Sequence, residues 1–329
     1  MQKSLRLAVF LLALMLISCS RKPPEQAGDD SYRSAVALPS WYAQETVDTL
    51  SVVSWNIEHF VDSHDNPYID NMREDDPPGN MEERRQLLAK AIREMDADIV
   101  VFQELESDSY LRSFAEEYFP EMGYEVFAAL ESPDWYMNVV MMSQVPLGMF
   151  HSYAHVNTPI PGQKDESGRP ASQSFTNNRM WTADILVNEG YRFTLSGLHL
   201  KAGGGDRNAA WRMGQIQLLR EYLEVLMEGD PERNMLVLGD LNTTPDSREF
   251  STLLGDTDPE FVDPLAGTDS YSHPSDSLFW RIDHILPNTR MRNELVSNSL
   301  KVIEPLDRDQ MIRISDHLPL IARFHTADR

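Results

Sequence analysis

The chain reads Asn234-Met235-Leu236-Val237-Leu238-Gly239-Asp240-Leu241-Asn242, an apolar run that ends in a carboxylate and an amide. We expect a buried β-strand over 234–238, because the run is short, apolar and closed by a glycine. Side chains two residues apart in an extended chain point to the same side, so Asp240 and Asn242 would face one site. One of them could hold a water molecule while the other binds a metal or a substrate. Residues 239–242 are also typical of a simple turn.

Polar side chains end five further apolar segments of the chain. The segments are Ser54-Trp55-Asn56-Ile57-Glu58, Phe102-Gln103-Glu104, Leu198-His199-Leu200-Lys201, Arg281-Ile282-Asp283-His284 and Ser315-Asp316-His317-Leu318-Pro319. Taken singly, each has an ordinary explanation: His199 could be a hydrogen-bonded core histidine, and Asp283 a surface charge. Asn56 is more informative, because an amide is costly to bury without hydrogen-bond partners.

The side chains in these segments are carboxylates, amides and imidazoles. Oxygen ligands of this kind select Mg²⁺ or Mn²⁺ rather than zinc. Asp316-His317 joins a carboxylate to an imidazole that can exchange a proton near neutral pH. A metal with positioned carboxylates and imidazoles can drive the attack of water on phosphorus, so the set predicts a phosphoesterase.

Apolar spacing along the rest of the chain predicts a mixed, α+β order of strands and helices. Strands are expected at 49–57, 98–104, 137–142, 180–187, 191–200, 281–286 and 318–324. Helices are expected at 82–95, 110–118, 208–227 and 249–254. The polar stretches 62–80, 157–178 and 256–278 are expected to be loops. Layered sheets with helices outside would bring several loops to one edge, where sites tend to lie.

The N-terminus has the pattern of an export signal. Residues 1–18 begin with basic residues and continue in an apolar run over 7–17, which is too short to span a bilayer. Leu16-Ile17-Ser18-Cys19 resembles the lipobox of bacterial lipoproteins, which implies a diacylglycerol on Cys19; the alternative is an ordinary signal peptide. Residues 19–45 predict a flexible tether and 46–329 a folded domain. We therefore expect export and lipid anchoring to the periplasmic or surface face of a bacterial envelope.

The amino-acid composition limits which class of protein and which kinds of substrate are expected. The 329 residues are 41% hydrophobic, which allows a substantial core, and Cys19, as the single cysteine, excludes an intrachain disulfide. A net charge of −23 repels polyanions at long range, and the chain lacks the basic patch typical of a nucleic-acid binder. A phosphate bridged by a metal is still compatible with this charge, because a bound cation dominates the local field.

Taken together and in this order, the polar segments resemble those of the endonuclease/exonuclease/phosphatase family, which includes pancreatic deoxyribonuclease, apurinic endonucleases, neutral sphingomyelinases and inositol-polyphosphate phosphatases. The resemblance covers roughly residues 47–324, and its most specific parts are Gly239-Asp240-Leu241-Asn242 and Ser315-Asp316-His317-Leu318-Pro319. It implies a four-layered α/β sandwich, with two packed, mainly antiparallel sheets flanked by helices.

The resemblance also implies a role for each site residue. Glu104 would be the principal ligand of Mg²⁺ or Mn²⁺, with Asn56 and Asp316 beside it. Asp240 would orient or deprotonate the attacking water. Asn242 would hold that water or a phosphate oxygen.

Further roles follow from the same resemblance. His317 would contact the phosphoryl group, and Asp283 would fix the tautomer of His317. His199 would be a second imidazole at the phosphate. Arg179 matches a family arginine before a strand. Tyr136 is a candidate for a family tyrosine, although it could equally be a core aromatic residue.

The function implied is divalent-metal-dependent phosphodiester hydrolysis of a nuclease-like kind by a monomer. One alternative is a phosphatase or phospholipase C-like hydrolase acting on an inositol phosphate, a sugar phosphate or a lipid headgroup at the membrane. An alternative of another class is a catalytically inactive surface-binding lipoprotein, which would be expected to have lost part of the site.

Overall fold

The structure, a computed structural model, describes residues 47–329 apart from 133–134, 189 and 256–259. The signal peptide, Cys19 and the tether expected over 19–45 lie outside the described residues. Within the part described, none of the helices combines the length and apolarity that a membrane crossing requires.

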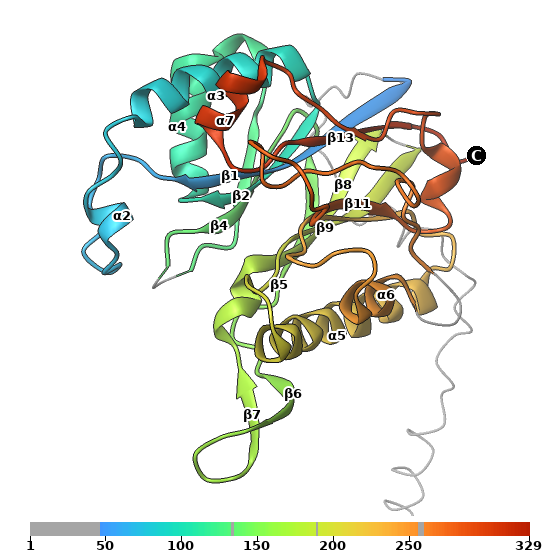
Figure 1. The fold of residues 1–329 in the computed structure, drawn as a ribbon. Coiled ribbons are helices and arrows are strands. Elements are labelled where there is room, and N and C mark those ends of the chain that lie inside the picture. The colour runs from blue at the N-terminus through green and yellow to red at the C-terminus, as the bar shows by residue number, and fades with distance from the viewer. Residues whose placement is uncertain (1–46, 133–134, 189, 256–259) are drawn as a thin grey trace, which may run out of the picture. The chain divides into compact units, whose positions relative to one another are not determined.

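Two sheets form the centre of the fold (Figure 1). The first has the strand order β12 (Lys301–Val302), β13 (Leu320–His325), β1 (Thr49–Phe60), β2 (Ile99–Leu105), β4 (Asn138–Ser143) and β3 (Val126–Ala129). The second has the order β11 (Asp283–Pro287), β10 (Met235–Asp240), β9 (Tyr191–His199), β8 (Met180–Asn188) and β5 (Leu147–Ser152). Neighbours are antiparallel except for β1 with β2 and β9 with β10. The expectation of mainly antiparallel sheets is confirmed.

Helices cover the outer face of each sheet, as Figure 1 shows. The helices α3 (Met81–Met95), α4 (Asp108–Tyr118) and α7 (Arg308–Ile314) share one apolar core with β1 and β2. The helices α5 (Asp206–Gly229) and α6 (Arg248–Leu254) share another with β9 and β10. A third core lies between the sheets, so the four-layered α/β sandwich is confirmed.

Strand β1 shows how the sequence builds these layers. Val53, Trp55 and Ile57 join the core beneath α3, while Leu50 and Val52 join the core between the sheets. Successive side chains of a strand point to opposite faces, and here both faces are buried. A strand of this kind therefore carries an almost unbroken apolar run instead of an alternating one.

The segment 157–178, expected to be a loop, forms a hairpin of β6 (Thr158–Lys164) and β7 (Pro170–Gln173) followed by a 3₁₀ turn at Phe175–Arg179. The loop prediction was wrong there. The Asp165 carboxylate closes the hairpin by accepting the backbone N–H groups of Ser167 and Arg169, each at 2.9 Å. The hairpin projects from the body of the fold (Figure 1) and buries few side chains, among them Thr158, Ile160 and Gln173, so its sequence has no extended apolar periodicity.

The remaining differences concern short elements. A single helical turn, α2 (Met72–Asp75), interrupts the loop expected over 62–80. The elements β3, β5, β12 and α7 were not predicted from the sequence. These elements are brief, and packing against longer neighbours stabilises them where local propensity does not.

The two sheets are joined by Trp181, whose ring is fully buried and whose Nε1 donates to the carbonyl oxygen of Val139 at 2.9 Å. The ring lies over Gly197 on the neighbouring strand, where a Cβ atom would come within 2.5 Å of it. Only glycine therefore leaves room for the ring.

We expect Gly197→Ala to lower the free energy of unfolding by about 1–3 kcal/mol, because the added methyl group must displace a packed ring. Urea denaturation measures the change. Gly204→Ala is the matched control, since a Cβ at Gly204 meets no described atom within 4 Å. Equal stability of the two variants would contradict this packing.

Candidate active site

Polar residues replace apolar ones where the strands reach one end of the space between the sheets. On β10, Leu236 and Leu238 belong to the core between the sheets, and Asp240 is the next residue on that face. Strand register places Asp240 directly between His199 of β9 and Asp283 of β11. The two-residue alternation therefore gathers one imidazole and two carboxylates side by side.

Asp240 is the centre of the site and is almost fully buried. Its Oδ2 accepts a hydrogen bond from Asn56 Nδ2 at 3.0 Å and lies 3.7 Å from His199 Nε2 and 3.9 Å from His317 Nε2. Its Oδ1 accepts the backbone N–H of Asn242 at 2.8 Å. Burial, together with the charge of Asp283, raises the pKa of Asp240 to about 7.

The turn after Asp240 depends on its backbone conformation. Gly239 has a φ of 138°, and a Cβ there would lie 1.9 Å from the carbonyl oxygen of Leu198. Asn242 has a φ of 49°, which asparagine tolerates better than most residues, and its Nδ2 donates to the carbonyl oxygen of Leu200 at 3.1 Å. The segment Gly239–Asn242 is therefore a shaped turn that fixes the Asp240 carboxylate from its own backbone.

His317 is oriented by Asp283, whose Oδ2 lies 2.8 Å from His317 Nδ1 and also accepts the hydroxyl of Ser272 at 2.6 Å. Trp55 Nε1 donates to the carbonyl oxygen of His317 at 3.0 Å and so anchors its backbone to β1. Burial alone would lower the pKa of His317, but the carboxylates of Asp283 and Asp240 raise it to about 10. The ring is therefore an imidazolium at neutral pH, with Nε2 directed toward Asp240.

Glu104 interrupts the register of β2 with β4, and its φ of 61° turns its side chain into the site. Its Oε1 lies 3.4 Å from Asn56 Nδ2 and 3.7 Å from His199 Nε2. Its Oε2 accepts the backbone N–H of His59 at 3.1 Å. Burial raises the pKa of Glu104, and no lysine or arginine among the described residues forms an ion pair with it.

The donor chemistry of the site fits a hard divalent cation. Glu104, Asn56 and Asp316 offer two carboxylates and an amide, the oxygen ligands that Mg²⁺ and Mn²⁺ prefer. Two groups of three possible ligands lie here, and within each group the ligand atoms are within 4.8 Å of one another. One group is Asp316, His273 and His317, and the other is Asp240, Asp283 and His317. A cation beside Glu104 would also balance a largely enclosed carboxylate that lies close enough to the negative charge of Asp316 to be affected by it.

Arg179 and Tyr136 are buried at the side of this group. Arg179 packs its guanidinium over the rings of Trp135 and Phe175, and its Nε has no hydrogen-bond partner within the described part of the chain. The Tyr136 hydroxyl lies 2.7 Å from His59 Nδ1. Tyr136 therefore contacts the site through His59. Among the described residues, its hydroxyl forms no hydrogen bond with Glu104.

Two further histidines belong to the site. His59 Nε2 lies 3.7 Å from Glu104 Oε2, and burial lowers the pKa of His59 to about 4. His273 Nε2 lies 3.5 Å from Asp316 Oδ2, and its ring packs on that of His317 with centroids 4.5 Å apart. His59 could have been suspected from its closeness to Asn56. His273 follows no apolar strand, so no sequence pattern indicates that it belongs to the site.

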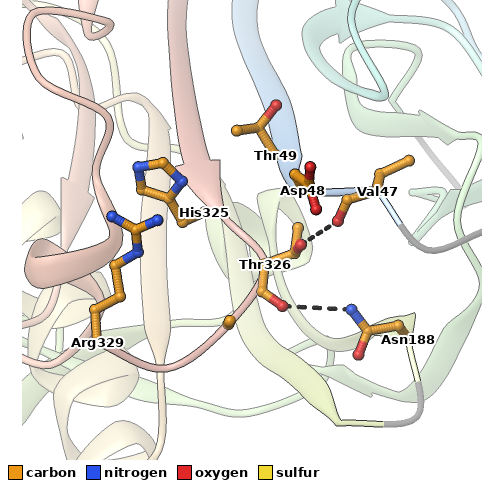
Figure 2. A pocket seen from close by; sticks show the side chains of 8 residues that line it. Val47, Asp48, Thr49, Asn188, His325, Thr326 and Arg329 are labelled. Atoms are coloured by element: carbon orange, nitrogen blue, oxygen red, sulfur yellow. Dashed lines mark hydrogen bonds between the residues drawn. The ribbon is translucent and has the colours of Figure 1, made fainter.

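A separate surface pocket of about 450 Å³ lies at the other end of β1 (Figure 2). It is lined by Val47, Asp48, Thr49, Asn188, His325, Thr326, Ala327 and Arg329. There Asn188 Nδ2 donates to the carbonyl oxygen of Thr326 at 3.3 Å, and the Thr326 hydroxyl donates to the carbonyl oxygen of Val47. The pocket contains none of the predicted site residues.

Comparison with known proteins identifies the family and the fold. A model of the endonuclease/exonuclease/phosphatase family matches residues 53–317. Among curated proteins, no sequence matches the chain.

Several solved structures share the fold. The catalytic domain of human Nocturnin with bound sulfate is 18% identical, with 85% of this chain and 97% of that one covered and a TM-score of 0.56. TDP2 of D. rerio, complexed with a single-strand DNA product, is 17% identical, with 85% and 100% covered and a TM-score of 0.55. An endonuclease/exonuclease/phosphatase from Bacteroides vulgatus is 16% identical, with 84% and 99% covered and a TM-score of 0.56.

We expect the His317 imidazole of the cation-free protein to titrate near pH 10, far above its ordinary value of 6.5, because Asp283 and Asp240 stabilise the imidazolium. NMR titration in EDTA measures this pKa. Asp283→Asn should move the titration to lower pH, whereas the exposed Asp276→Asn should leave it unchanged. An ordinary pKa in the unsubstituted protein would contradict the arrangement.

Proposed function

Because this chain belongs to the endonuclease/exonuclease/phosphatase family and is a phosphoric ester hydrolase, we propose that it cleaves phosphodiesters by attack of water, with Mg²⁺ or Mn²⁺ as cofactor. The observation that carries the proposal is the pairing of Asp240 and His317. A buried carboxylate of raised pKa lies 3.9 Å from an imidazolium that a second carboxylate fixes. Such a pair can take a proton from water and also stabilise charge on the phosphate.

Glu104, Asn56 and Asp316 would hold the cation. When bound, it would polarise a phosphoryl oxygen and offset the negative charge that grows there in the transition state. Because the net charge of −23 repels anions at long range, a bound cation would also favour the approach of an anionic substrate by changing the local field.

Asp240 orients the attacking water and accepts its proton. Hydrogen bonds from Asn56 Nδ2 and from the backbone N–H of Asn242 hold the carboxylate in one orientation. This placement lowers the entropic cost of the attack. Asn242 contributes chiefly by shaping the turn, and its side-chain oxygen, which accepts no hydrogen bond from the described residues, can accept one from the water.

His317 donates from Nε2 to a phosphoryl oxygen as negative charge develops there. Asp283 accepts the Nδ1 proton, and the raised pKa keeps the ring doubly protonated at neutral pH, so Nε2 also carries a proton and can donate it to the phosphoryl oxygen. His199 adds a second, neutral imidazole, because burial and the neighbouring Arg179 hold its pKa well below the ordinary value.

A diester is favoured over a monoester by the aromatic side chains beside His273, whose ring packs on that of His317. The Trp280 ring stacks on His273 at 5.8 Å between centroids, and Phe279 packs against Trp280. Both side chains are about half exposed and can contact the second substituent that a diester carries. The D. rerio TDP2 structure contains a DNA product, which agrees with a substrate of this class.

The acidity of the chain favours a second candidate, a phosphatase or phospholipase C-like hydrolase of inositol phosphates, sugar phosphates or lipid headgroups. A long polyanion would be repelled by the field of this protein, whereas a small ester would be repelled less. The third possibility, an inactive binding lipoprotein, conflicts with the presence of every predicted site residue.

We expect the purified protein to hydrolyse bis-p-nitrophenyl phosphate and plasmid DNA or RNA in Mg²⁺ or Mn²⁺, and to lose this activity in EDTA. Release of p-nitrophenol and gel electrophoresis of the nucleic acid measure it. Hydrolysis of p-nitrophenyl phosphate alone would refute the diesterase proposal in favour of a phosphatase.

In the same assay, Asp240→Asn and His317→Ala should each lower kcat by about 10²–10⁴-fold, since each removes a proton-transfer or charge-stabilising group. Asp246→Asn, an exposed carboxylate a few residues away, is the matched control and should retain activity. Circular dichroism checks that the variants are folded. Undiminished turnover in either site variant would exclude that residue from the reaction.

For the N-terminus, the proposal includes removal of residues 1–18, lipidation of Cys19 and a monomeric domain tethered to the bacterial envelope. We expect cells that express the full chain to incorporate radiolabelled palmitate into it, and Cys19→Ser to abolish the label, because that thiol is the acceptor. Gel fluorography measures it. Equal labelling of the variant would refute the anchor.

A further inference from the structure

A second group of carboxylates lies in the loop that joins β1 to α3, outside the proposed active site. One carboxylate oxygen from each of Asp65, Glu74 and Asp75 lies within 4.8 Å of the others. Asp65 and Asp75 are exposed, whereas Glu74 is only 1% exposed. The three residues are separated by up to ten positions, so the folding of the loop brings the charges together.

Glu74 differs from an ordinary surface acid. Its Oε1 accepts the backbone N–H of Asn66 at 2.6 Å, while its Oε2 is buried and has no hydrogen-bond partner among the described residues. Within that same part of the chain, no lysine or arginine forms an ion pair with any of the three carboxylates. Burying an oxygen of an ionised carboxylate without a partner is strongly unfavourable unless a cation or a hydrogen bond compensates its charge. Burial and the charges of Asp65 and Asp75 accordingly raise the pKa of Glu74.

We propose that Asp65, Glu74 and Asp75 form a Ca²⁺ site, distinct from the catalytic cation site at Glu104. The bound ion satisfies the unpartnered Oε2 and removes the repulsion between the three carboxylates. Ca²⁺ suits the site better than Mg²⁺, because it accepts irregular sets of carboxylate, carbonyl and water oxygens, whereas Mg²⁺ demands a near-ideal octahedron. The exposed sides of Asp65 and Asp75 leave room for water to complete the coordination.

The site has a structural consequence for the active centre. Ile69, in the same loop, packs in a small core with Val61, Tyr136 and Met137. The Tyr136 hydroxyl contacts His59, which donates its backbone N–H to Glu104. A Ca²⁺ ion that fixes the loop therefore also stabilises Tyr136 and His59, through which the loop is connected to the ligand Glu104.

Isothermal titration calorimetry with Ca²⁺ tests the site in a Glu104→Gln background, where the catalytic cation site is impaired. The measured heat of binding does not depend on enzymatic activity. We expect this protein to bind one Ca²⁺ ion, and the further pair Asp65→Asn and Asp75→Asn to weaken binding by about tenfold or more, because affinity follows the number of charged ligands. Asp70→Asn, an exposed acid of the same loop outside the cluster, is the matched control and should bind as the background does. If Glu104→Gln does not fold, Asp316→Asn provides the background instead.

Thermal unfolding gives a second measurement. Ca²⁺ should raise the Tm of the background and of its Asp70→Asn derivative, but not of the derivative that lacks Asp65 and Asp75, because an ion bound only to the folded state stabilises it. Absence of Ca²⁺ binding in the background, or equal binding after the loss of both aspartates, would overturn the proposal. Binding of Mg²⁺ as tight as that of Ca²⁺ would overturn the choice of calcium.

Discussion

The two-residue alternation of the strands, enforced by burial on both faces, is the constraint on which the rest of this structure depends. Each central strand sends alternate side chains into the space between the sheets, and at one end of that space the apolar side chains give way to Asn56, His199, Asp240 and Asp283. A register shift of one residue would turn Asp240 toward α5 and bring Leu241 into the site. The packing of the core therefore fixes the positions of the active-site side chains.

Within that frame, burial divides the titratable groups into different states. Burial raises the pKa of Asp240 and of Glu104, while the carboxylates of Asp283 and Asp240 raise the pKa of His317. Environments that move neighbouring pKa values apart assign the acid and the base of a reaction. A divalent cation would balance the remaining negative charge of Glu104 and Asp316.

Much of this site could be predicted from the sequence, because its residues directly follow or precede apolar strands. The turn Gly239-Asp240-Leu241-Asn242 and the pair Asp316-His317 are recognisable as short motifs, and the strands that carry Asn56 and Glu104 are long apolar runs. His273 could not be predicted, since its contacts with Asp316 and His317 are made across 43 and 44 positions of the chain by a loop without periodicity. The β6–β7 hairpin was missed for a related reason: polar bonds from Asp165 close its turn, and its buried residues are few and mostly polar, namely Thr158, Ile160 and Gln173. The lipid anchor at Cys19 stays a prediction.

The central claim is that these strand-end side chains form one pocket that holds a divalent cation against phosphate. A crystal structure of the protein with Mn²⁺ and phosphate, with the ion located by anomalous scattering, tests that claim most directly. We predict a Mn²⁺ ion at about 2.1 Å from oxygens of Glu104 and Asp316, with phosphate between the ion and His317. Phosphate bound away from His317, or Mn²⁺ with no contact to Glu104, would contradict the account.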